Sequence, residues 1–135
     1  EDLIQEVEKS RGPYKVNQVA EKAAVAALKD ADGWAESIRS EVQTNRTRLA
    51  DALRERGLSP LPSAANFILI PVEPASALEV NRALRARGVA GRPFPRLPGL
   101  GDTLRITVGP WEQMETFLDA LDQLFEPGTM PGSEG

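Results

Sequence analysis

Apolar residues recur along this chain with helical spacing in five segments, and they form short runs in three others. The helical spacing predicts amphipathic helices over residues 2–10, 18–29, 34–56, 76–87 and 111–125. The short runs predict strands over residues 66–70, 89–92 and 103–108. The order of these segments predicts an α/β (α+β) fold, in which helices cover one face of a small mixed sheet of about three strands.

The helices are expected to differ in how much of their surface is buried. Asn17 can cap an alanine-rich helix, and the small side chains of that helix predict packing on more than one of its sides. The long third helix carries an apolar stripe that begins at Trp34, which we expect in the core, and that has a polar gap at Asn45 and Arg46. In the fourth helix, the side chains expected to point inward are Leu78, Val80, Ala83 and Leu84.

The first two strands are predicted to be very different from each other. The run from Asn66 to Ile70 is apolar on both faces and is closed by Pro71, which predicts a strand in the interior of a sheet. The second strand is short and ends at Arg92. A loop rich in proline and glycine is predicted to follow it over residues 93–101.

The third strand carries the most informative residue of the chain. Because side chains alternate along a strand, Arg105 is predicted to share a face with the hydroxyls of Thr103 and Thr107, opposite the apolar residues. A guanidinium fixed in this way on a rigid backbone is well placed to bind a carboxylate with two parallel hydrogen bonds. The alternative is an arginine on the solvated face of an antiparallel sheet.

Arg92 is the second candidate binding residue. If its strand pairs with the one that holds Arg105, the two arginines come to a common edge and can together bind a doubly anionic small molecule. Tyr14 and Asn66 are further candidate substrate contacts at the mouth of a cleft. The alternatives are a solvated loop for Arg92, a packing role for Tyr14 and a structural cap for Asn66.

Composition limits the classes of function. The chain has 135 residues, of which 41% are hydrophobic and 27% charged, as is typical of one compact globular domain. The net charge of −4 argues against a general nucleic-acid binder. The chain has no cysteine, which excludes a disulfide, and no histidine, which removes the usual general base. We therefore expect no metal site. We also expect a cytoplasmic protein that does not contact membranes. Glu1 in place of an initiator methionine predicts a fragment of something larger.

Four segments of the chain together resemble the C-terminal part of the histidinol-phosphate aminotransferase family. They are residues 11–17 (RGPYKVN), 64–69 (AANFIL), 88–94 (GVAGRPF) and 104–109 (LRITVG). The family belongs to the class I/II aminotransferases of the aspartate aminotransferase fold (fold type I), which depend on pyridoxal phosphate and, in this branch, serve histidine biosynthesis. The resemblance extends over nearly the whole chain.

The resemblance implies a division of the chain and roles for its residues. It implies that residues 1–16 are the end of a large-domain helix and a hinge, that 17–126 form the small domain, and that 127–135 are a disordered tail. It also implies that Arg105 binds the α-carboxylate of the substrate and that Arg92 contacts the far end, which is a phosphate in histidinol phosphate.

The family's catalytic lysine motif, Ser-Lys followed by Gly-x-Arg-x-Gly, does not occur in this sequence. The resemblance therefore implies that pyridoxal 5'-phosphate is held covalently by a large domain outside this chain. It implies no catalytic residue here, an inactive fragment, and a parent protein that is a homodimer. Aromatic amino-acid aminotransferases and a phosphothreonine decarboxylase remain open as relatives. Two alternatives belong to other classes of function. One is a stand-alone small α/β module that binds an amino acid for regulation, and the other is a structural scaffold.

Overall fold

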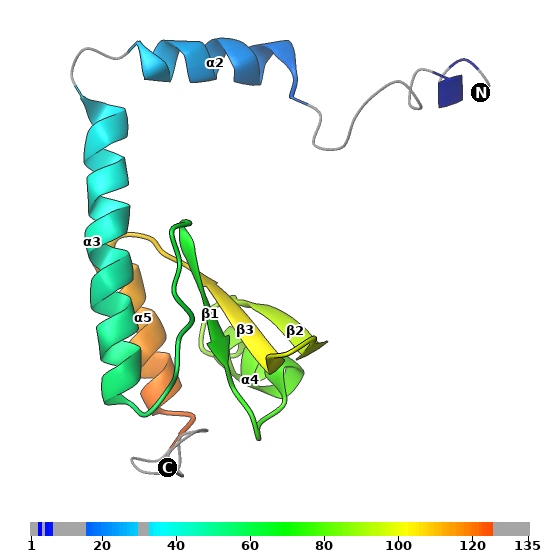
Figure 1. Cartoon of the computed structure of the whole chain (residues 1–135), viewed down its shortest axis with the longest axis vertical. Helices are drawn as coiled ribbons and strands as arrows, with labels where there is room; N and C mark the ends of the chain where they lie inside the picture. The colour runs from blue at the N-terminus through cyan, green and yellow to red at the C-terminus, as the bar shows by residue number, and fades with distance from the viewer. Residues whose placement is uncertain (1–2, 4, 7–15, 30–32, 126–135) are drawn as a thin grey trace. The chain divides into compact units, whose positions relative to one another are not determined.

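A computed structural model describes residues 3, 5–6, 16–29 and 33–125 (Figure 1). The chain forms two compact units, Glu1–Ile38 and Arg39–Gly135. Tyr14, nearly all of the predicted first helix and hinge, and the predicted tail lie outside the described residues, so those expectations stay predictions. No helix in the described ranges is both long enough and apolar enough to span a membrane.

Helix α2 (Gln18–Leu28) begins as predicted but is not packed as predicted. The side chain of Asn17 accepts a hydrogen bond of 2.8 Å from the backbone N–H of Ala20, which confirms the cap. None of the helix residues is buried, and Val19 and Leu28 are 77% and 83% exposed. Within its own unit the helix is therefore not packed on several sides as predicted, and alanine favours a helix there through its intrinsic propensity.

Helix α3 (Trp34–Glu55) buries only the second half of its predicted stripe. Leu49 and Leu53 are completely buried, whereas Trp34 is 61% and Ile38 43% exposed. The assignment of Trp34 to the core is therefore wrong. Helical spacing shows which residues share a face, but it does not show how far along the helix that face is covered.

The sheet contains β1 (Phe67–Pro71), β2 (Arg92–Leu97) and β3 (Gly101–Thr107), in the order β1-β3-β2. The number of strands is as predicted, but both pairings are antiparallel, so the sheet is not mixed. Helix α4 (Ala77–Arg85) connects β1 to β2, and β3 lies between these two strands and runs opposite to both (Figure 1). No parallel pair therefore forms.

The strands differ from prediction at both edges of the sheet. β1 is an edge strand and not an interior one, and its outer side is covered by the preceding loop, where the N–H of Leu61 donates to the carbonyl of Leu69 at 2.9 Å. β2 occupies residues that the prolines predicted to be loop. Pro93 and Pro95 are tolerated because an edge strand needs backbone donors on only one side.

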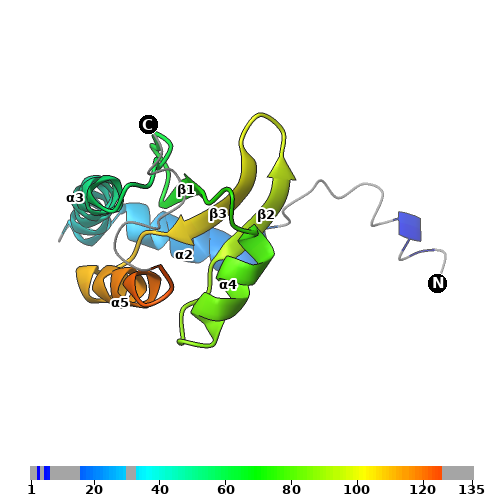
Figure 2. The same cartoon turned by 90° about the horizontal axis from the view of Figure 1, so that it is seen from below.

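Helix α5 (Trp111–Asp122) completes the core with α4 and α3. Figure 2 shows α4 and α5 on the same side of the sheet. The side chains on the sheet face toward them are buried, and in α5 Phe117 is 1% exposed. Of the α4 residues expected to point inward, Val80 and Leu84 are buried, but Leu78 is 51% exposed. The expectation for Leu78 is therefore wrong, because the buried face of this short helix is centred on Ala77, Val80, Asn81 and Leu84.

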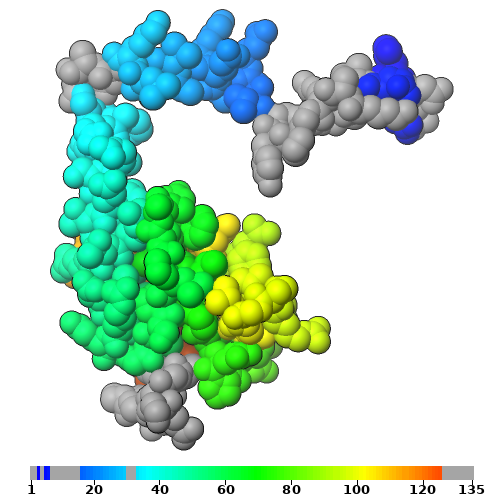
Figure 3. Space-filling model, viewed as in Figure 1, coloured from blue at the N-terminus to red at the C-terminus, as the bar shows by residue number. Residues whose placement is uncertain are grey.

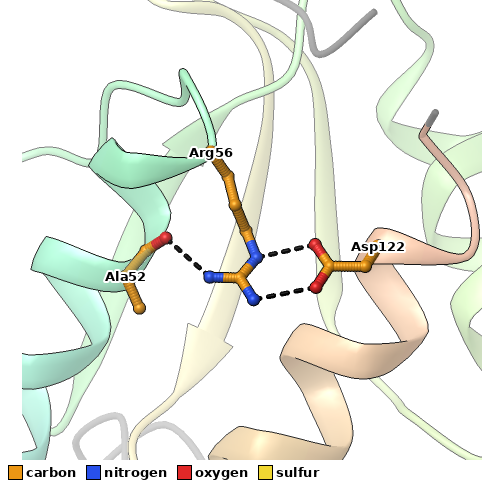
Figure 4. A network of polar contacts seen from close by, with 3 residues as sticks. All are labelled: Ala52, Arg56 and Asp122. Carbon is orange, nitrogen blue, oxygen red and sulfur yellow. Dashed lines mark hydrogen bonds and ion pairs between the residues drawn. The ribbon is translucent and has the colours of Figure 1, made fainter. Parts of the chain in front are cut away.

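An ion pair joins the C-terminal end of α3 to α5. Arg56 donates from Nε and Nη2 to the two carboxylate oxygens of Asp122, at 2.6 and 2.8 Å (Figure 4). Its Nη1 also donates to the carbonyl of Ala52 at 2.9 Å, so the guanidinium is fixed in one orientation. The two helices that support the end of the sheet are thus connected by a planar, bidentate contact.

Candidate functional site

Arg92 and Arg105 lie directly opposite each other on the neighbouring strands β2 and β3. Residues that are directly opposite in an antiparallel pair project from the same face, with Cβ atoms about 5 Å apart. The strand pairing that was predicted to bring these two arginines together is therefore present. Leu69 of β1 is the partner of Arg105 on its other side, so the pair lies across the middle of the sheet.

The two arginines project from the sheet face that α4 and α5 leave uncovered. Leu104 and Ile106, the neighbours of Arg105 along β3, are buried at 1% and 4% exposure on the opposite face. Arg105 itself is half-buried and Arg92 is exposed. Figure 3 shows the strands of the sheet at the surface on this side. Within the described residues of the unit that holds the sheet, this face is therefore open to a small molecule.

Only one of the two hydroxyls expected beside Arg105 is available. Thr107 is exposed. Thr103 is completely buried, and its Oγ1 donates to the carbonyl oxygens of Gly101 and Leu100 at 3.3 and 3.4 Å. The hydroxyl of Thr103, which was predicted to flank the guanidinium, is therefore bonded to carbonyls of the segment before it and is not free for a ligand.

Aromatic rings support both guanidinium groups. Cζ of Arg105 lies 5.1 Å from the ring centroid of Phe67, and Cζ of Arg92 lies 5.1 Å from that of Phe94. Stacking of this kind orients a guanidinium and leaves its N–H groups free to donate in the plane. Sequence periodicity marked both phenylalanines only as strand residues, because these contacts depend on the register and on side-chain conformation.

The arrangement is electrostatically unbalanced. Among the described residues, no carboxylate pairs with Arg92 or Arg105, although each is a permanent cation. Like charges directly opposite in a sheet are destabilising by up to about 1 kcal/mol. An anion bound between the two forks would remove this repulsion and satisfy several N–H donors at once. The geometry therefore favours a ligand with one or two carboxylate or phosphate groups.

The structure does not bring the other two candidate residues into this pair. Asn66 is exposed just before β1, and its backbone carbonyl accepts a hydrogen bond of 2.8 Å from the N–H of Val108. Among the described residues, the side chain of Asn66 forms no hydrogen bond with either arginine. Tyr14 lies outside the described residues. Roles for both in substrate binding stay predictions.

Asp102 supports the strand that carries Arg92, and sequence reasoning did not identify this residue. Its carboxylate accepts hydrogen bonds from the N–H of Ala77, at the start of α4, and from the N–H of Arg96 in β2, at 2.7 and 3.0 Å. Arg96 has a positive φ of 51°, at the irregularity between Phe94 and Leu97. Asp102 thus fixes the end of β2, the strand that carries Arg92, to the helix behind it.

These hydrogen bonds predict a pH dependence. The bond from Ala77, followed by the one from Arg96, lowers the pKa of Asp102 below its usual value, because both bonds favour the ionised carboxylate. The resulting stabilisation is present above the unfolded pKa of about 4 and is lost as the pH falls through the lower folded value. In Asp102→Asn, we expect the free energy of unfolding to decrease less steeply than in the wild type as the pH falls through this range. Urea titration at a series of pH values measures it. An acid limb identical to that of the wild type would contradict the assignment.

The two lysines among the described residues, Lys22 and Lys29, are exposed on α2 and at its end, and neither lies on the strands that carry the arginines. The described ranges also contain no group of three or more acidic side chains that could hold a metal ion. What this sheet face offers to a ligand is the pair of guanidinium groups, which can bind an anion.

Comparison with known proteins identifies the family. The model of aminotransferase class I and II matches residues 1–121. A histidinol-phosphate aminotransferase of Roseiflexus castenholzii is 40% identical over 128 residues, which is 92% of this chain but 34% of the relative. The chain therefore spans about a third of the length of this relative.

Solved structures agree with the sequence comparison. The histidinol-phosphate aminotransferase of Clostridium acetobutylicum superimposes with a TM-score of 0.69 at 25% identity, covering 91% of this chain and 38% of that one. The enzyme from Sinorhizobium meliloti, in complex with pyridoxal-5'-phosphate, gives 0.64 at 26% identity, over 89% of this chain and 33% of that one. The predicted fold is thus confirmed in its architecture, and the chain belongs to the class I and II aminotransferase family.

Proposed function

We propose that this chain is the substrate-binding small domain of a pyridoxal phosphate-dependent aminotransferase that resembles histidinol-phosphate aminotransferase. The observation that carries the proposal is the pair of unneutralised arginines, Arg92 opposite Arg105, on the open face of the sheet. The substrates of such an enzyme are an amino acid or an amino-alcohol phosphate and a 2-oxo acid. All of these carry the carboxylate or phosphate groups that guanidinium forks bind.

The two arginines have different roles in this proposal. Arg105 is half-buried on the central strand and binds the α-carboxylate of a substrate that has one. Arg92 is exposed on an edge strand and binds the group at the far end of the substrate. Asn66 and Tyr14 are proposed as further contacts. A substrate held by both arginines is restricted in orientation, which lowers the entropic part of the barrier for the reaction that follows.

The remaining chemistry is proposed to come from residues outside these 135. Pyridoxal 5'-phosphate, when bound, supplies the chemistry of amino-group transfer. In this proposal a large domain contributes the lysine that holds the cofactor, and the complete protein is a homodimer. The chain by itself would then bind substrate anions without transaminating them.

A visible absorption spectrum tests the proposal. The protein produced from its complete reading frame is expected to be yellow, and its visible band is expected to bleach when L-glutamate is added as amino donor. A colourless protein would contradict the proposal. If that colourless protein still bound an amino acid saturably, the regulatory module would be the better explanation of the arginine pair.

Replacing Arg92 separates the two roles. We expect Arg92→Ala to raise the KM for histidinol phosphate about tenfold, because charge-assisted hydrogen bonds contribute about 1.5–3 kcal/mol each and an exposed site retains only part of this. The KM for L-alanine, which has no anionic group at its far end, should change much less. Steady-state kinetics on the complete protein measures both constants. An equal rise for the two substrates would show that Arg92 does not contact the far end.

A further inference from the structure

The polar gap in the apolar stripe of α3 is hydrogen-bonded to the two chain segments just outside the strands of the β1–β3 ladder. Asn45 is 6% exposed, and its Nδ2 donates to the backbone carbonyl of Gly109 at 2.9 Å. The next residue, Arg46, donates from Nη1 to the backbone carbonyl of Ala65 at 2.8 Å. Gly109 follows the end of β3 and Ala65 precedes the start of β1. Two adjacent residues of one helix thus hold two chain segments that are distant in sequence.

Both hydrogen bonds act at the same end of the ladder. Phe67 and Thr107 are its terminal pair, and the carbonyl of Asn66 accepts a bond of 2.8 Å from the N–H of Val108 just beyond them. Ala65 and Gly109 come next along the chain, outside the two strands. The place of this end of the sheet is therefore set by α3 and not only by apolar packing.

Arg105 depends on this end of the ladder in two ways. Arg105 lies four residues before Gly109, a distance of about 13 Å along an extended strand. A displacement of Gly109 would therefore also displace Arg105, because the two residues are connected through β3. Its guanidinium also lies over the ring of Phe67, two residues after Ala65. A shift of either carbonyl would consequently move the guanidinium or the ring that supports it.

The residue types are informative as well. An apolar residue at position 45 would continue the stripe of α3 and pack against the core. Burying an amide costs free energy unless it is hydrogen-bonded, and the carbonyl of Gly109 gives the buried Asn45 amide such a partner. The side chain that interrupts the stripe therefore acts through one directional contact.

We propose that Asn45 and Arg46 are positioning residues for the anion site. By fixing the carbonyls of Gly109 and Ala65, they set the place of the Arg105 guanidinium relative to the bound carboxylate. This inference rests on the proposed function, because it relies on Arg105 as the residue that binds the substrate.

The test is steady-state kinetics with L-glutamate on the protein from the complete reading frame. In Asn45→Asp, the carboxylate has no N–H to donate and repels the carbonyl of Gly109. We expect the KM to rise about three- to tenfold, the effect of losing about one hydrogen bond, while kcat stays within about twofold. Val80→Ala is the control for a general loss of stability, because Val80 has the same exposed fraction of 6% but lies on α4, and it should leave the KM unchanged.

Variants of Arg46 provide a second arm that does not depend on the folding of Asn45→Asp. Arg46→Ala removes the donor to Ala65 and should raise the KM in the same way. Arg46→Lys retains a donor and should restore a KM close to that of the wild type. A wild-type KM in Arg46→Ala would overturn the role of Arg46.

A double variant separates positioning from a general structural effect. If Asn45 acts through Arg105, adding Asn45→Asp to Arg105→Ala should raise the KM no further. An equal factor in both backgrounds, or a wild-type KM in Asn45→Asp alone, would overturn the inference while leaving the proposed function intact. If instead Arg105→Ala alone left the KM unchanged, the proposed function would fail, and the positioning role would fail with it.

Discussion

Replacing Arg105 with alanine should raise the KM for L-glutamate about 100-fold in the protein from the complete reading frame. The guanidinium is half-buried on the central strand and stacked on Phe67, so it can present two parallel N–H donors to a carboxylate with little loss of conformational freedom. Two charge-assisted hydrogen bonds of about 1.5–3 kcal/mol each correspond to a loss of this size or larger. Initial rates at a series of glutamate concentrations measure it.

Two further variants show whether the effect comes from the fork geometry. Arg105→Lys retains the charge but not the planar pair of donors, and it should recover only part of the affinity. Arg85→Ala removes an equal charge from the exposed side of α4 and should leave the KM unchanged. A KM in Arg105→Ala equal to that of the wild type would show that Arg105 is an ordinary arginine on a solvated sheet face.

The largest effect on stability is expected from Phe117→Ala in α5. Phe117 is 1% exposed and is the largest fully buried side chain among the described residues. Its truncation removes apolar contacts and leaves a cavity, which costs about 3–5 kcal/mol. Because domains of this size are stable by only about 5–15 kcal/mol, the variant should be close to unfolding. Urea denaturation followed by circular dichroism measures the change in the free energy of unfolding.

Leu78→Ala is the matched control. Leu78 lies on α4 at 51% exposure, so its truncation should cost less than about 1 kcal/mol. Similar losses in the two variants would contradict the arrangement of the core, in which α5 is covered and this side of α4 faces solvent.

The helices and strands could be predicted from the sequence wherever a local pattern of residues determines them. In β3, strict alternation placed Arg105 opposite its buried neighbours, and Asn17 marked the start of α2. Local pattern failed where tertiary context decided. The proline-rich segment of β2 is a strand only because it forms the sheet edge, and Trp34 is exposed because the core does not extend along the whole of α3.

The candidate site was predictable in its charges but not in its supports. The two arginines could be identified because each lies in a strand pattern, and their pairing follows from adjacent antiparallel strands. The stacking on Phe67 and the bonds from α3 to the strand ends connect residues that are 38 and 64 positions apart in the chain, counting from Phe67 to Arg105 and from Asn45 to Gly109. No periodicity within a single segment contains that information.

A crystal structure of the complete protein with bound L-glutamate would test the central claim most directly. We predict that the guanidinium of Arg105 donates two hydrogen bonds of about 2.9 Å to the α-carboxylate, with Arg92 directed at the second carboxylate. A glutamate bound away from the open sheet face, with both guanidinium groups in contact only with solvent, would contradict the assignment of this arginine pair as the substrate-binding site.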